Sequence, residues 1–266
     1  MDNYLQSNQQ LWNEWTTLHE QSPLYNLAGF KAGASTLRPV EREELTNVAG
    51  KTLLHLQCHF GLDTLSWARE GAIVTGVDLS DRSIALARSL STEVAIPATF
   101  VCSDLLDLPN ALSGKFDIVF TSYGVLNWLH DLNGWAAVVA HFLKPGGIFY
   151  IVEFHPFSRV FASDSAELKV ANPYFCSEEP FRFEIQGSYA AEATTLLQGY
   201  NWNHSLSEVF NALIGVGLRI EFFNEFPFTL RERIAGMVQG EDGLWRLPRQ
   251  HGMVPLLFSL QARKPS

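Results

Sequence analysis

The stretch that decides the fold is "LLHLQCHFGLDTL", residues 53–65, read together with "VTGVDLS", residues 74–80. In the first, a short apolar run leads into a turn and then into a helical pattern that Gly71 ends. In the second, another apolar run ends in Asp78. A strand, a turn, a helix and a second strand that ends in an acid predict the opening of a nucleotide-binding α/β domain.

The same alternation continues along the chain. Residues 98–104 and 116–124 are rich in β-branched and aromatic residues, as expected of strands that helices cover on both faces. A helix is predicted over 132–143, and the turn "KPGG", residues 144–147, leads into a strand over 148–154. This rhythm predicts an α/β fold with a mostly parallel, doubly wound sheet and right-handed crossovers.

Three segments lie outside this rhythm, and we expect all of them to belong to one domain, residues 1–266. Residues 1–50 are rich in aromatic residues and predict an N-terminal cap. Residues 156–203 and 227–255 are long insertions, of the kind that form lids or binding loops. The α/β core resumes between and after these insertions. Ser205 and Glu208 predict a capping box at the start of a helix, and two closing strands are predicted over residues 218–226 and 254–263.

Composition narrows the class of protein. The 266 residues are 47% hydrophobic, enough for a sizeable core, and the net charge is 19 − 28 = −9. An acidic chain without a Lys/Arg run argues against a nucleic-acid surface. Three scattered cysteines, no secretion signal and no run of about 18 apolar residues predict a cytoplasmic protein without a membrane span.

The candidate ligand-binding residues follow predicted strands. In an open parallel sheet, ligands bind beyond the carboxyl ends of the strands, where the loop at 57–61, Asp78 and Asp104 all fall. Asp78 comes about 20 residues after that loop, the spacing of a carboxylate that accepts hydrogen bonds from both ribose hydroxyls. Asp104, one strand further on, is placed to accept from an adenine amine.

On these residues the chain resembles the class I S-adenosylmethionine-dependent methyltransferases. The similarity also includes "FVCSDLLDLP" at 100–109, "FDIVFTSYGVLNWL" at 116–129 and "LKPGGIFYIVEF" at 143–154. The "PGG" turn after the helix is more typical of these enzymes than of dehydrogenases. The resemblance implies a Rossmann-like sheet of seven strands with the last one antiparallel. It also implies S-adenosylmethionine as the cofactor and methyl transfer to a small acceptor.

The resemblance assigns roles to individual residues. Asp78 with Leu79 would hold the ribose, and Asp104 with Leu105 the adenine. The residues that would border the methionine part are Gln57, Cys58 and Gly61 through their backbone, and Thr121 and Ser122 at the end of the fourth strand.

The loop at 57–61 departs from the family pattern, which would have glycines where Gln57 and His59 stand. Glycine permits a positive φ and a close approach of the backbone to a ligand. Either this loop curves differently or its side chains narrow the pocket. His55, Cys58 and His59 also suggest a metal site, but no second Cys/His pair accompanies them, so we expect no metal.

Further candidates concern the methyl acceptor. His155 follows the fifth strand and is the first candidate for a general base. Tyr123, a second catalytic candidate, lies with Asn127 and Trp128 in a segment that could line the acceptor site. In the N-terminal cap, Lys31 could pair with the cofactor's carboxylate. Two aromatic residues of the same cap could close over the substrate, Tyr25 and Phe30.

Two other functions compete with this hypothesis. A nicotinamide-dependent oxidoreductase shares the strand, loop and acid, although the missing glycines and the position of "KPGG" disfavour it. A non-catalytic regulatory module that binds S-adenosylmethionine is the other, because fold does not fix function. The aromatic residues of 156–203 suggest an enclosed pocket for a small molecule, or alternatively a homodimer interface.

Overall fold

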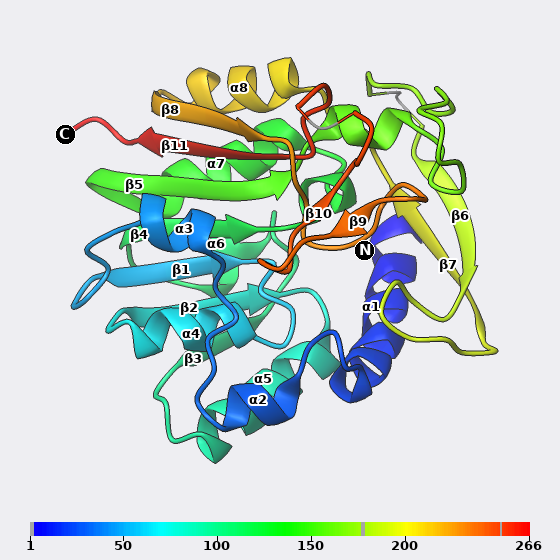
Figure 1. Cartoon of the computed structure of the whole chain (residues 1–266). Coiled ribbons are helices and arrows are strands. Elements are labelled where there is room, and N and C mark those ends of the chain that lie inside the picture. The colour runs from blue at the N-terminus through cyan, green and yellow to red at the C-terminus, as the bar shows by residue number, and fades with distance from the viewer. Residues whose placement is uncertain (1–2, 177–178, 251) are drawn as a thin grey trace.

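The computed structural model describes residues 3–176, 179–250 and 252–266, and its centre is a seven-stranded sheet (Figure 1). The strand order is β3-β2-β1-β4-β5-β11-β8. Neighbours among β1 to β5 pair in parallel, whereas β11 is antiparallel to both β5 and β8. This confirms the predicted sheet, including its antiparallel last strand. The strands are β1 (Thr52–Leu56), β2 (Ile73–Asp78), β3 (Thr99–Cys102), β4 (Phe116–Ser122), β5 (Leu143–Phe154), β8 (Arg219–Phe226) and β11 (Leu257–Arg263).

Helices connect and cover these strands. Ser205 and Glu208 form the predicted capping box at the start of α8. No helix of the described residues is both long and apolar enough to cross a membrane. The helices are α1 (Asn3–Gln21), α2 (Leu27–Lys31), α3 (Pro39–Glu44), α4 (Leu62–Arg69), α5 (Asp81–Glu93), α6 (Leu108–Ala111), α7 (Leu132–Phe142) and α8 (Leu206–Gly215), with the 3-10 turns η1 (Leu126–Trp128) and η2 (Pro156–Val160).

The two faces of the sheet bury different layers, because successive side chains of a strand point to opposite faces. From β1, Leu54 and Leu56 join the core that α7 and α8 complete. Leu53 of the same strand joins a second core with Trp67 of α4. Strands that are apolar on both faces are what a doubly wound sheet requires.

The "KPGG" segment differs in detail from its prediction. It was expected as a turn before the fifth strand, but it lies inside β5. The pairing advances from Phe116–Leu143 to Ile118–Ile148, so residues 144–147 form an irregularity that leaves the ladder. Gly146 has a φ of 75°, which favours glycine at this point.

The N-terminal cap and the first insertion pack against each other. Residues 156–203 contain an antiparallel hairpin of β6 (Phe181–Gln186) and β7 (Leu196–Asn201). Asn8 of α1 donates to the Tyr200 carbonyl and accepts from the Tyr200 N–H, both at 2.9 Å. In Figure 1, α1 and this hairpin lie together beyond the carboxyl ends of the parallel strands.

The second insertion, residues 227–255, has a small core of its own. It carries the short strands β9 (Val238–Gln239) and β10 (Trp245–Arg246), which pair with each other. Four of its buried side chains cluster apart from the main sheet, together with Leu256 just after it: Ile234, Met237, Leu247 and Val254. The segment that leads from β8 into this core carries Arg231 and Arg233, which reach the cavity described next.

Candidate functional site

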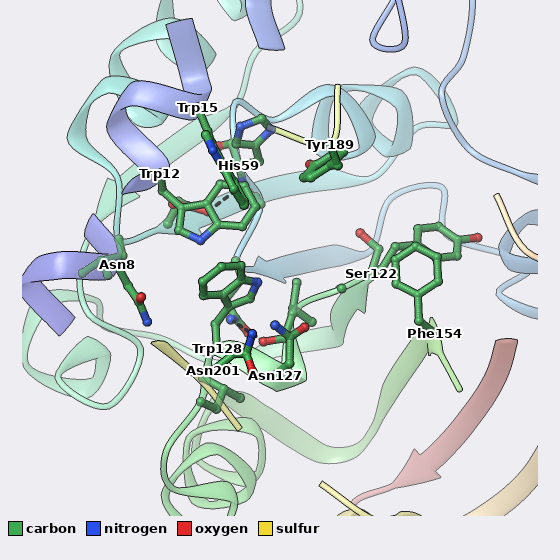
Figure 2. A pocket seen from close by; sticks show the side chains of 18 of the residues that line it. Asn8, Trp12, Trp15, His59, Ser122, Asn127, Trp128, Phe154, Tyr189 and Asn201 are labelled. Atoms are coloured by element: carbon green, nitrogen blue, oxygen red, sulfur yellow. Dashed lines mark hydrogen bonds between the residues drawn. The ribbon is translucent and has the colours of Figure 1, made fainter. Parts of the chain in front are cut away.

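One cavity of about 680 Å³ lies over the carboxyl ends of the parallel strands. Its walls come from the ends of β1, β2, β4 and β5, from α1 and from both insertions. Figure 2 shows Trp12, Trp15 and Trp128 grouped in one part of it, and Ser122 with Phe154 in another. Small-molecule and cofactor sites typically enclose about 300–1,000 Å³, so this cavity has the size of such a site.

The loop after β1 keeps the path of a glycine-rich turn without the glycines. Gln57 and His59 have φ values of 57° and 53°, in the left-handed region that favours glycine. This answers the question that the sequence left open, because the loop does not take a different, right-handed course. Gly61 has a φ of 78°, which also favours glycine, and a Cβ at this position would lie only 2.7 Å from the Phe100 ring.

The side chains of this loop turn in different directions. The Gln57 amide donates to the Val125 carbonyl at 3.1 Å, and its Oε1 is buried without a partner among the described residues. His59 packs against Trp12 at 5.3 Å between ring centroids, and its Nε2 lies 3.4 Å from Nδ1 of His19. Burial lowers the pKa of His59 well below its usual value, so its imidazole is neutral.

Asp78 is held where β2 ends. Its Oδ2 accepts from the His59 N–H at 2.7 Å and its Oδ1 from the Ser80 N–H at 2.9 Å. Burial raises the pKa of this carboxyl to about 6, against the opposing effect of those hydrogen bonds. Each oxygen keeps a lone pair for a ligand hydroxyl, and Leu79 beside it lines the cavity.

Asp104 and Leu105 line the cavity beyond β3. Asp104 is partly buried, and this burial raises its pKa. Leu105 is 6% exposed and joins the core beneath. The loop at 57–61, Asp78 and Asp104 together form what we call the acidic end of the cavity.

A second group of polar side chains follows β4. His55 Nδ1 lies 2.8 Å from the Thr64 hydroxyl and its Nε2 lies 3.3 Å from the Ser122 hydroxyl. The Ser122 hydroxyl also donates to Asp63, at 3.3 Å. Burial raises the pKa of Asp63 and lowers that of His55 to about 3, so burial disfavours the charged form of both.

Tyr123 lines the cavity next to Ser122 and donates from its hydroxyl to Glu41 of α3 at 2.6 Å. Burial raises the pKa of Glu41 to about 7. Burial and the neighbouring Glu41 raise the pKa of Tyr123 well above its usual value, so the phenol stays protonated at neutral pH.

The other acceptor candidates that reach the cavity come from α1's neighbourhood and η1. Trp128 packs against Trp12 at 5.3 Å and Trp15 at 5.9 Å between ring centroids, and Asn127 lies beside it. Tyr25 lines the cavity and its hydroxyl lies 2.5 Å from that of Tyr189.

Four predicted site residues are not among those that line the cavity. Phe30 is 1% exposed in the core beside α5, and Lys31 forms an ion pair with Glu93 at 2.9 Å. Thr121 is fully buried, with no partner for its hydroxyl among the described residues. His155 is likewise buried: Nε2 pairs with Glu225 at 2.9 Å and Nδ1 accepts from the Phe157 N–H at 3.1 Å.

The positions of Thr121, His155 and Lys31 outside the cavity lining have physical reasons. Side chains alternate along β4, so Ser122 faces the cavity while Thr121 faces the core. His155 caps η2 with the nitrogen that a general base would need. Lys31 lies in the last turn of α2, where its stem leads away toward α5.

Sequence reasoning missed Arg38 and three further arginines that line the cavity, Arg159, Arg231 and Arg233. We call these three, with Phe154 and Tyr189, the arginine end of the cavity. The two arginines of "RER", residues 231–233, were a signal of a cationic site. Neither insertion has a sequence pattern that would place it at the end of a particular strand.

The metal hypothesis concerned His55, Cys58 and His59. Their side chains turn to separate partners: Thr64 and Ser122 for His55, His19 for His59, and the carbonyl of His59 for the buried Cys58 thiol. Elsewhere, one ligand atom each of Cys176, His204 and Glu208 lies within 4.8 Å of the others. His204 Nε2 bonds to the Leu129 carbonyl at 2.7 Å and Glu208 caps α8, so both have structural partners. We assign no metal to this group.

Comparison with known proteins shows which families this chain resembles. Residues 54–151 match the family described as "Methyltransferase domain". The chain is 30% identical, over 150 residues, to the ubiquinone biosynthesis O-methyltransferase of Chromobacterium violaceum; this match covers 55% of the chain and 59% of that protein. The chain thus matches about three fifths of the length of this curated relative.

Solved structures agree on the fold. An S-adenosylmethionine-dependent methyltransferase from Mesorhizobium loti matches with a TM-score of 0.56 at 21% identity, over 88% of this chain and all of that one. The glycopeptide N-methyltransferase MtfA, in complex with S-adenosylmethionine, matches with a TM-score of 0.54 at 18% identity, over 84% and 91%. Residues 54–151 therefore match a methyltransferase domain, and the chain has the fold of the class I S-adenosylmethionine-dependent methyltransferases.

Proposed function

We propose that this protein transfers the methyl group of S-adenosylmethionine to a small-molecule acceptor bound in the same cavity. The observation that carries the proposal is the continuity of that cavity. It joins the acidic end, where the resemblance places the cofactor, to an aromatic and cationic compartment enclosed by α1 and the insertions. S-adenosylmethionine supplies an electrophilic methyl group, and the protein's task is to align the acceptor with it.

The residues present suit the cofactor. Asp78 offers two carboxylate oxygens for two vicinal hydroxyls, and Asp104 offers an acceptor for the adenine amine. The left-handed backbone at Gln57 and His59 preserves the close approach that a glycine-rich loop provides. We place four cavity-lining residues at the methionine part of the cofactor: Gln57, Cys58, Gly61 and Ser122.

Tyr123 is the catalytic residue we propose in place of His155. Tyr123 lines the cavity, and its hydroxyl donates to Glu41, whose pKa of about 7 suits a proton acceptor near neutral pH. An acceptor hydroxyl or amine could pass its proton through Tyr123 to Glu41. Tyr123→Phe should then lower kcat while leaving the affinity for S-adenosylhomocysteine within about twofold.

Calorimetric titration of the full chain with S-adenosylmethionine and S-adenosylhomocysteine is the direct test. Binding of both, followed by release of S-adenosylhomocysteine with an acceptor from a small-molecule panel, would support the proposal. Absence of binding to the wild-type chain would reject it. Binding without transfer to any acceptor would favour the regulatory module instead.

Two further proposals concern the setting of the protein. We propose a cytoplasmic location, which suits the free cysteines Cys58 and Cys102. We also keep the homodimer as a prediction, supported by exposed apolar side chains in the first insertion, among them Phe175 and Phe181, which are 70% and 59% exposed. Light scattering on the purified chain would measure its mass.

A further inference from the structure

Three guanidinium groups converge on one end of the cavity. Arg159 lies in η2, after β5, and Arg231 and Arg233 come from the second insertion. The Arg233 guanidinium carbon lies 4.3 Å from the centre of the Phe154 ring, and that of Arg231 lies 5.6 Å from the same centre. Arg231 also stands 4.5 Å from the centre of the Tyr189 ring. Two cations therefore share one aromatic side chain at the cavity wall.

These arginines lack the partners that other arginines of the chain have. Arg82, Arg246 and Arg263 each pair with a carboxylate at 2.6–2.8 Å. Within the described part of the chain, no carboxylate lies within 4.0 Å of the guanidinium groups of Arg159, Arg231 or Arg233. The Nε of Arg233 is buried and has no hydrogen-bond partner there. A buried donor without a partner costs about 1–3 kcal/mol, so its retention indicates a ligand.

The carboxylate of Glu153, which lies near this arginine cluster, already has other hydrogen-bond partners. Glu153, at the end of β5, is 4% exposed and influences the pKa values of Arg159 and Arg233. Its two oxygens accept from four backbone N–H groups, those of Gly124, Val125, Leu126 and Phe154. Burial and the neighbouring Arg231 and Arg159 lower the pKa of Arg233 well below its usual value, and Glu153 opposes this shift.

The position of this cluster points to the acceptor rather than to the cofactor. The arginines follow β5 and β8, whereas the acidic end follows β1, β2 and β3. A sulfonium is a cation, and three guanidinium groups would repel it. Phe154 stands 6.1 Å from Tyr123 between ring centroids, so the arginine end adjoins the residue that we propose for catalysis.

We propose that the methyl acceptor is an anion, with a carboxylate or phosphate group bound by Arg231 and Arg233 and supported by Arg159. Planar guanidinium groups bind both kinds of group through paired N–H donors. The aromatic walls, including Phe154, Tyr189 and Trp128, suit an aromatic or apolar body for the same molecule. This inference rests on the proposed function and narrows it to a class of substrate.

The test uses the full chain saturated with S-adenosylhomocysteine and three matched probes: benzoate, phenyl phosphate and the neutral benzamide. Calorimetry should show that at least one anion binds at least about tenfold more tightly than benzamide. Arg231→Gln and Arg233→Gln should weaken that binding at least about tenfold each. Arg246→Gln is the control, because Arg246 lies in the same insertion outside the cavity and pairs with Asp242. The stronger of the two anions identifies the group.

Separate readouts distinguish the possible failures. If S-adenosylhomocysteine binds but neither anion binds better than benzamide, the inference is overturned and the proposed function stands. If the arginine variants weaken S-adenosylhomocysteine as much as the anion, the arginines serve the cofactor and the inference is again wrong. If the wild-type chain does not bind S-adenosylhomocysteine, the proposed function fails first. Arg231→Lys and Arg233→Lys preserve the charge, and thermal unfolding of every variant checks that it folds.

Discussion

The two ends of the cavity differ both in charge and in the way the chain builds them. The acidic end consists of residues within a few positions of a strand end, so the sheet fixes them directly. The arginine end depends on segments that leave the sheet for tens of residues and return, packed on α1 and on a small separate core. The end that we propose for the cofactor is therefore fixed by the general fold, and the end that we propose for the acceptor by the particular insertions of this chain.

This difference suggests that the two ends of the cavity bind different molecules. Substitutions at the acidic end should change cofactor binding whatever the acceptor is. Substitutions at the arginine end should change acceptor binding and leave the cofactor alone.

Asp78→Ala should nearly abolish cofactor binding. The change removes two charge-assisted hydrogen bonds to the ribose and the acceptor that holds the His59 and Ser80 N–H groups. We expect a loss on the order of 1,000-fold in S-adenosylhomocysteine affinity, or about 4 kcal/mol. Calorimetry measures it, and Asp107→Ala, at an exposed acid outside the cavity, is the matched control. Affinity within tenfold of wild type would show that the acidic end does not hold the ribose.

Glu41→Gln should change how stability depends on pH. Burial raises the pKa of Glu41 from 4.5 to about 7, so the folded state favours the protonated form. The stability that this proton provides is complete below pH 4.5 and is lost as the pH rises through about 7, by about 3 kcal/mol. Glutamine can accept from the Arg38 N–H and donate to Tyr123, so it keeps both contacts without the charge.

Chemical unfolding at pH 5 and pH 8 provides the measurement. The variant should gain stability relative to wild type between the two values, by up to about 3 kcal/mol. Equal pH dependence in the two proteins would mean that Glu41 titrates normally. It would also remove Glu41 as the proton acceptor behind Tyr123.

The sequence predicted the sheet and the acidic end because both depend on local patterns. Apolar runs, the glycines that end helices and the acids that follow strands predict β1, β2 and Asp78, each from the residues next to it in the sequence. It did not predict Arg231 and Arg233 as cavity residues, because their place depends on how the second insertion packs, which no periodicity encodes. Thr121 and Ser122 show the same limit at a smaller scale: both were expected beside the cofactor, but only Ser122 lines the cavity, since alternation reverses the face at each residue.

The pH dependence of cofactor binding tests whether Asp78 acts as a carboxylate. Burial raises its pKa to about 6, so it is ionised above that value and protonated below it. Protonation removes a hydrogen-bond acceptor, so S-adenosylhomocysteine affinity should fall about tenfold from pH 7.5 to pH 5. Asp78→Asn should bind weakly with a flat profile over this range. A flat profile in the wild type would contradict the prediction.

The smallest effect concerns the loop whose glycines are missing. At Gln57, with φ 57°, glycine should be more stable than alanine by about 1 kcal/mol, whereas at an ordinary position glycine is the less stable of the two. Both variants lose the hydrogen bond to Val125 equally, so their difference isolates the backbone. Unfolding of Gln57→Gly and Gln57→Ala measures it, and Gln261→Gly with Gln261→Ala, in β11, supplies the reference of opposite sign. If alanine were the more stable residue at 57, the loop would not follow the left-handed path, and the basis for treating it as a cofactor loop without glycines would be lost.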